Sequence, residues 1–127
     1  MHDLFERYAE AWGRHDPDAI VALHTEDTRF HAHIGQDPAT GKAAVRQAFA
    51  DLFTQFPDLA FEQVSLKTAS DYWVVEWMMS GTLAATGAAF EVDLVDLITV
   101  ADGLVRTKDS YLDAVSMQAQ LGLAVAQ

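Results

Sequence analysis

The pattern of apolar and polar positions predicts that the chain opens with two helices. Residues 3–14 carry large apolar side chains at close to i, i+4 and i+8 spacing, with charged residues between them, which is typical of an amphipathic helix. Those apolar residues are Leu4, Phe5, Tyr8 and Trp12. Asp16 followed by Pro17 predicts the start of a second, short helix, which we expect to end near Glu26 and Asp27.

The next segment predicts a strand and a third helix. Residues 28–34 alternate between polar and apolar side chains, which indicates a short strand with one face of each kind. A turn-rich loop follows, and Thr40 can then cap a helix over residues 42–55 that Pro57 stops.

The second half of the chain has the composition of β-strands. Four segments rich in β-branched and aromatic residues are separated by turn signals such as Thr86-Gly87 and Asp102-Gly103. The segments are 59–68, 72–84, 89–100 and 104–113. Strands joined by such short turns run antiparallel, because a parallel crossover needs a dozen or more residues. We therefore expect an α+β fold, with three N-terminal helices packed on a curved antiparallel sheet and a helix-like tail over 114–121.

Length and charge narrow the classes of function. A chain of 127 residues is expected to form a single domain, residues 1–127. Its 19 acidic residues against 8 basic ones give a net charge of -11, which repels phosphate groups, so neither nucleic acid nor a membrane is an expected partner. The absence of cysteine excludes thiolate nucleophiles and cysteine-bound metals. The N-terminus lacks the pattern of a secretory signal, and we expect a cytoplasmic protein.

Two aspartates interrupt the apolar segment 92–100 and are candidates for chemistry. Asp93 and Asp96 are three residues apart in a predicted strand, so their side chains point to opposite faces of the sheet. Whichever carboxyl faces the helices is expected to have a raised pKa, which suits a general acid, a base or a hydrogen-bond donor. A structural, hydrogen-bonded carboxyl is the alternative.

The register of the last hairpin decides what lies opposite Asp96. A two-residue turn at Asp102-Gly103 places Asp109 opposite Asp96, so that two carboxylates share one face. One extra turn residue or a bulge places Ser110 there instead. The sequence leaves both registers open.

Histidines and aromatic residues offer two further interpretations. His31 and His33 share a strand face downstream of His24 and Asp27, which is compatible with a metal site. A His-x-His pattern without a spaced third ligand is common by chance, so we expect no metal and no cofactor. The aromatic residues line either a ligand cavity or the core. They are Phe5, Tyr8, Trp12, Phe30, Phe49, Phe53, Trp73 and Trp77.

The order of predicted elements resembles the nuclear-transport-factor-2-like superfamily, whose conical fold holds a pocket between helices and a concave sheet. Residues 19–49, AIVALHTEDTRFHAHIGQDPATGKAAVRQAF, resemble ketosteroid isomerases and SnoaL-like polyketide cyclases in their helix, acidic turn, strand, loop and helix. Residues 102–122 resemble the last hairpin and the Gln-Leu-Gly ending of SnoaL-like chains. The resemblance implies a homodimer formed through the sheet.

The resemblance also implies roles for individual residues. The oxyanion-holding tyrosine of the isomerases falls on Tyr8 and their protonated aspartic acid on Asp96, whereas their aspartate base falls on Ala32. In SnoaL-like cyclases the acid-base aspartate corresponds to Asp96, or to Asp109 if it faces inward. We expect a small apolar ligand to contact residues that surround these positions. They are Trp12, Phe30, Ala32, Phe53 and Ser110.

These observations support three hypotheses about function. In the first, an isomerase or cyclase acts on an apolar carbonyl compound through an enolate, with Tyr8 and Asp96 as donors and Asp109 or a histidine moving the proton. In the second, which Ala32 favours, the chain is a non-catalytic dimeric ligand-binding or scaffold module. The third is a metal-assisted site around His24, His31 and His33.

Overall fold

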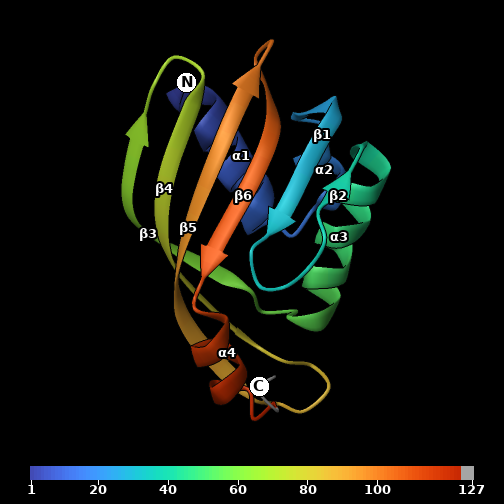
Figure 1. Ribbon diagram of the computed structural model, residues 1–127, viewed down its shortest axis with the longest axis vertical. Coiled ribbons are helices and arrows are strands. Elements are labelled where there is room, and N and C mark those ends of the chain that lie inside the picture. The colour runs from blue at the N-terminus through green and yellow to red at the C-terminus, as the bar shows by residue number, and fades with distance from the viewer. Residues whose placement is uncertain (124–127) are drawn as a thin grey trace.

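The computed structural model describes residues 1–123 and consists of one six-stranded sheet with helices packed on it (Figure 1). In chain order the elements are α1 (His2–Gly13), α2 (Pro17–Val21), β1 (His24–Ala32), β2 (Ala39–Thr40), α3 (Lys42–Gln55), β3 (Ala60–Thr68), β4 (Tyr72–Thr82), β5 (Ala89–Ala101), β6 (Leu104–Leu112) and α4 (Ala114–Gln120). This arrangement confirms the predicted α+β class and adds the short strand β2, which the sequence pattern did not reveal.

The strands lie in the order β2-β1-β6-β5-β4-β3. The strands β3 to β6 form the predicted antiparallel meander, whereas β1 pairs with β6 in parallel. The rule that short turns join antiparallel strands does not apply to that pair, because α3 and four strands separate β1 from β6 along the chain. The parallel register places Phe30 beside Lys108 and Ala32 beside Ser110.

The second helix is shorter than expected, and the strand after it begins earlier. The helix ends at Val21, and β1 starts at His24 instead of residue 28. The amide of Val105 donates to the carbonyl oxygen of Leu23 at 2.7 Å, so pairing with β6 begins at the end of the short helix. Sheet pairing therefore overrides the helical pattern of residues 20–24. The expected cap at Thr40 was also wrong, because Thr40 belongs to β2 and Gly41 takes the N-cap position of α3.

The core lies between the helices and the inner face of the sheet. The predicted apolar stripe of α1 is buried there, and α3 contributes Val45 and Phe49, both fully buried. Trp73 and Ile98 cover the sheet side of the same core. Burying one such side chain contributes about 1.5–3 kcal/mol to stability, so this packing fixes α1 against the sheet.

The outer face of the sheet lies on the side away from α1, α2 and α3 (Figure 1). Because side chains alternate along a strand, those that stand between the buried residues point to this outer face. Val74 and Leu97 are among them and are register partners. The helix α4 packs near the start of β5, where the side chain of Gln120 hydrogen-bonds with the backbone of Glu91. None of the helices within residues 1–123 is long and apolar enough to cross a bilayer.

Candidate functional site

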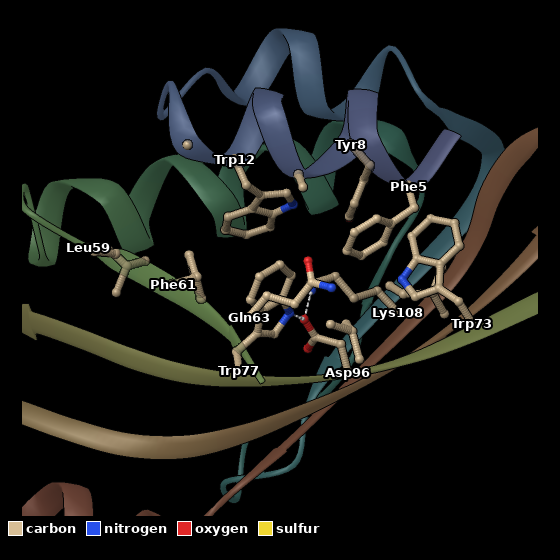
Figure 2. Close-up of a pocket in the computed structure, with 15 residues that line it drawn as sticks. Phe5, Tyr8, Trp12, Leu59, Phe61, Gln63, Trp73, Trp77, Asp96 and Lys108 are labelled. Carbon is tan, nitrogen blue, oxygen red and sulfur yellow. Dashed lines mark hydrogen bonds and ion pairs between the residues drawn. The ribbon is translucent and has the colours of Figure 1, made fainter. Parts of the chain in front are cut away.

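A cavity of about 410 Å³ lies between α1 and the inner face of the strands β3 to β6 (Figure 2). Its wall is mainly apolar and rich in aromatic residues, and it also contains the side chains of Gln63, Asp96 and Lys108. The aromatic members are Phe5, Tyr8, Trp12, Phe61, Trp73 and Trp77. Such a wall suits a small, mainly apolar molecule that carries a polar group at one end.

Helix and strand periodicity explain why these side chains converge. The residues Phe5, Tyr8 and Trp12 lie one turn apart on α1 and point down toward the sheet (Figure 2). Alternate residues of β4, including Trp73 and Trp77, point up toward them. The ring of Phe5 stacks on Trp77 and meets Trp73 edge-on, with ring centroids 6.0 and 5.5 Å apart, which ties the helix to the floor of the cavity.

A buried ion pair lies at the floor of the cavity. The ammonium group of Lys108 is 3.0 Å from Oδ2 of Asp96, and both side chains are 7% exposed. The indole N–H of Trp77 donates to Oδ2 at 3.2 Å, and the hydroxyl of Ser110 donates to Oδ1 at 2.6 Å. The carboxylate thus receives donors from β4 and β6, which hold it in one orientation. Such pairing is needed because an isolated charge buried in an apolar site is strongly unfavourable.

Two donors at the cavity remain available to a ligand. The ammonium of Lys108 lies 5.0 Å from the centre of the Trp12 ring and 6.0 Å from that of Tyr8. Within residues 1–123, Asp96 is the one side chain that pairs with this ammonium, which has three N–H donors. The buried indole nitrogen of Trp12 likewise has no hydrogen-bond partner among the described residues. A ligand oxygen is the natural acceptor for such groups.

The hydroxyl of Tyr8 belongs to a buried chain of hydrogen bonds. It lies 2.9 Å from Nε2 of His24, whose Nδ1 lies 2.7 Å from the hydroxyl of Thr28. Thr28 donates to the carbonyl oxygen of Arg106, so it accepts from Nδ1–H of His24. His24 therefore presents an unprotonated Nε2, and the proton of Tyr8 points to it. The Tyr8 oxygen keeps the capacity to accept a hydrogen bond from a ligand.

Burial governs the protonation of both members of this chain. Burial, with smaller effects of the Lys108 and Lys42 charges, lowers the pKa of His24 to about 3. Burial raises the pKa of Tyr8 well above its usual range; the nearby indole N–H of Trp12 opposes this shift and the Asp96 carboxylate adds to it, both more weakly than burial. At neutral pH both groups are uncharged, so Asp96 and Lys108 are the charged side chains that line the cavity.

The hairpin register places Ser110 opposite Asp96, and Asp109 opposite Leu97. A bulge between Thr99 and Val100 shifts the register by one residue from that of an uninterrupted two-residue hairpin. Strand alternation then turns Asp109 to the outer face, so the structure does not bring Asp109 to Asp96. Of the two aspartates in segment 92–100, Asp96 is buried and Asp93 is exposed.

The other predicted ligand contacts lie at varying positions around the cavity. Trp12 lines it. Phe30 packs on Phe49, and Phe53 packs on Trp12, behind the lining side chains. Ala32 is the β1 neighbour of Ser110, on the inner side of the sheet. The expected grouping of His24 with His31 and His33 does not occur, because His24 faces the interior while the other two lie on the outer face with Asp109.

Sequence reasoning did not single out Lys108 and Gln63. The sequence does contain a signal for Lys108, because it lies two residues before Ser110. Side chains two residues apart in a strand point to the same face of the sheet. In the register that pairs Ser110 with Asp96, Lys108 has to face the cavity. No comparable signal marked Gln63, because it directly precedes the bulge in β3, where the alternation changes.

A curved sheet that encloses an aromatic cavity under a helix defines the class of conical α+β domains that hold small molecules. The protein-family model of the SnoaL-like domain matches residues 5–107, so the chain belongs to that family.

Solved structures show the same fold at low sequence identity. A protein with a ketosteroid-isomerase-like fold from Catenulispora acidiphila, in complex with trimethylamine, is 20% identical with a TM-score of 0.86, over 95% of this chain and 93% of that one. A protein from a Jannaschia species, described as a SnoaL-like polyketide cyclase, is 24% identical with a TM-score of 0.84, over 96% and 92% of the two chains. AclR from Streptomyces galilaeus, described as a hydroxylase, is 19% identical with a TM-score of 0.80, over 98% and 86%.

Proposed function

We propose that the protein binds a small aromatic or alicyclic carbonyl compound in the cavity and moves a proton on the carbon next to the carbonyl group. The observation that carries this proposal is the Asp96–Lys108 ion pair, buried at the floor of a mainly apolar cavity. A buried ion pair is a poor source of stability, because apolar residues of similar volume often do as well or better. Its place beside the cavity therefore favours a chemical role.

The ligand class follows from the wall and from the available donors. A cavity of about 410 Å³ suits a molecule of one to three fused rings. Its carbonyl oxygen would accept from the ammonium of Lys108 and the indole N–H of Trp12. The similar structure described as a SnoaL-like polyketide cyclase supports this class, since polyketides are carbonyl-rich.

In the proposed reaction, Asp96 acts as the base and Lys108 stabilises the negative oxygen. The bond between hydrogen and the carbon next to the carbonyl breaks, the proton goes to Oδ of Asp96, and the electron pair moves to the carbonyl oxygen. Lys108 keeps its protons and donates a hydrogen bond to the resulting enolate. Returning the proton from Asp96 to another carbon of a conjugated enolate completes an isomerisation. In a cyclisation the enolate carbon attacks a second carbonyl, whose electron pair moves to its oxygen, and that oxygen takes the proton from Asp96.

This assignment differs from the roles that the resemblance implied. There Tyr8 and a protonated Asp96 donate to the oxygen, whereas here the Tyr8 proton is directed to His24 and Asp96 is paired with a cation. We therefore propose Lys108 as the principal donor and Asp96 as the base that Ala32 does not provide. Tyr8 would accept a hydrogen bond from a ligand hydroxyl.

Binding can be measured directly, because all three tryptophans of the chain line the cavity. We expect 2-naphthol and 2-tetralone to quench the intrinsic fluorescence in a saturable way. Lys108→Met should weaken the binding of both compounds by roughly 10-fold or more, as expected for a lost charge-assisted hydrogen bond. Lys67→Met, which removes an exposed lysine of β3, is the matched control and should bind as the wild type does.

Proton transfer can be measured as deuterium exchange at the carbons next to the carbonyl of 2-tetralone, followed by NMR. We expect the wild type to accelerate this exchange and Asp96→Asn to reduce it by about 10²- to 10⁴-fold, the usual contribution of general acid–base catalysis. Asparagine keeps an acceptor for Lys108, and circular dichroism checks the fold. Equal exchange in wild type and Asp96→Asn would overturn the proposed base.

A second candidate function is ligand binding without turnover. Ala32 favours it, because a methyl group occupies the position where the related isomerases carry their base, beside Ser110. Saturable binding of 2-tetralone with no accelerated exchange would support this candidate over the enzyme.

A further inference from the structure

We propose that His31, His33 and Asp109 form a binding site for a divalent transition-metal ion on the outer face of the sheet. This site lies on the opposite side of β1 and β6 from the cavity, because Ser110 points inward and its neighbour Asp109 points outward. The proposal is therefore independent of the proposed function.

The parallel pairing of β1 and β6 brings the three residues together. His31 and Asp109 are register partners, and the amide of His33 donates to the carbonyl oxygen of Ser110 at 2.8 Å. One possible ligand atom from each of the three side chains lies within 4.8 Å of the other two. Metal bonds of about 2.1 Å allow ligand atoms up to about 4.2 Å apart, so small side-chain rotations complete the set.

The imidazole of His31 is already in the tautomer that a metal requires. Its Nε2 lies 2.9 Å from the carbonyl oxygen of Gln36, which can only accept, so Nε2 carries the proton. The lone pair is then on Nδ1, which is free to bind a metal. Metal-binding histidines commonly donate their other N–H to a backbone carbonyl in this way.

Asp109 and His33 are held by neighbours that leave the required atoms facing one another. Arg29 pairs with Oδ2 of Asp109 at 2.9 Å, and Oδ1 of the same carboxylate lies 2.8 Å from Nε2 of His33. The ring of Tyr111 stacks on that of His33, with centroids 4.1 Å apart and planes 7° apart. A metal ion would replace the proton between Nε2 and Oδ1, while Arg29 and Tyr111 fix the orientation of the two ligands.

The donor set indicates which ion would bind. Two imidazoles and one carboxylate suit Zn²⁺, Co²⁺ or Ni²⁺, whereas Mg²⁺ and Ca²⁺ prefer oxygen ligands. In the single chain the side chains of His33 and Asp109 are 28% and 12% exposed, so an ion can reach them before any association through this face. Three protein ligands leave a fourth position for water or an exogenous ligand.

The test is titration of the untagged, chelator-treated protein with Zn²⁺, followed by calorimetry. We expect one ion per chain. His31→Asn and His33→Asn should each weaken binding by more than roughly 100-fold, because even changes outside the direct ligands cost on the order of 10- to 100-fold. The control His2→Asn, which removes an exposed histidine of α1, should bind zinc as the wild type does.

A second measurement needs no variant. Zinc added to the wild type should shift the imidazole nitrogen resonances of His31 and His33 in long-range ¹H–¹⁵N spectra and leave those of His2 and His24 unchanged. Absence of stoichiometric binding, loss of binding in His2→Asn, or shifts at His2 in place of His31 and His33 would each overturn the site. Unchanged 2-naphthol binding in His31→Asn would show that the cavity is intact in that variant.

Discussion

At the scale of single residues, His24 makes stability depend on pH. Its pKa is lowered by burial to about 3 in the folded state, against about 6.5 for an exposed histidine. Between these values the unfolded chain binds a proton that the folded chain does not. The contribution of His24 is therefore complete above about pH 6.5 and is lost as the pH falls toward 3, by up to about 1.4 kcal/mol per pH unit.

Urea unfolding of the wild type and of His24→Gln at about pH 7, 6 and 5 checks this prediction. We expect the free energy of unfolding of the wild type to fall more steeply with decreasing pH than that of the variant. His2→Gln should follow the wild type, since His2 is exposed. Parallel profiles for wild type and His24→Gln would contradict the assignment, whatever the difference in absolute stability.

The residues of the site were only partly predictable from the sequence. The inward position of Tyr8 and Trp12 follows from helical spacing, and that of either Asp93 or Asp96 from strand alternation. The choice between Asp109 and Ser110 depended on a bulge at Thr99 and Val100, for which the sequence has no distinct signal. Because that bulge also determines where Lys108 points, the ion pair could not be derived before the register was known.

At the scale of elements, the hairpin between β5 and β6 depends on a turn with unusual backbone angles. Asp102 has φ 54° and Gly103 has φ 74°, as in the two-residue turns that favour Asp-Gly. A Cβ at Gly103 would meet nothing within 4 Å, so a substitution there causes no steric clash with neighbouring residues. Its cost comes from the positive φ, which residues with a side chain rarely adopt. Gly103→Ala should destabilise the protein by about 1–2 kcal/mol, measured by urea unfolding.

Gly13 provides the matched control for this turn. A Cβ at Gly13 also meets nothing within 4 Å, but Gly13 lies in the last turn of α1 without a positive φ. Gly13→Ala should therefore be neutral or stabilise by up to about 1 kcal/mol. Equal effects of the two substitutions would show that the positive φ at Gly103 does not limit stability.

The helices and strands were predictable where the spacing of apolar residues agreed with the residues that mark turns and helix ends. The amphipathic α1, the α3 stop before Pro57 and the β3 to β6 meander all matched their patterns. The region from Ala22 to Asp27 was misassigned because its side chains fit a helix as well as a strand. Pairing with β6, which lies some eighty residues away along the chain, decides between them, and no local pattern contains that information.

At the scale of the whole molecule, we expect two chains to associate through the outer faces of their sheets. Apolar side chains lie among acidic ones on this face, and the register pairs Val74 with Leu97 and Val95 with Tyr111. Tyr111 is 46% exposed. A solvent-facing apolar surface of this kind is typical of an interaction site.

The charge of the chain predicts how this association depends on salt. Each chain carries a net charge of -11, so two chains repel one another. This repulsion weakens with added salt, because the screening length falls from about 30 Å at 0.01 M to about 10 Å at 0.1 M. In sedimentation velocity the dimer fraction should therefore rise with added NaCl. Leu97→Glu should shift the protein to monomer, whereas Val115→Glu, on the exposed side of α4, should not. A monomer at every salt and protein concentration, or equal effects of the two substitutions, would exclude the outer face as the interface.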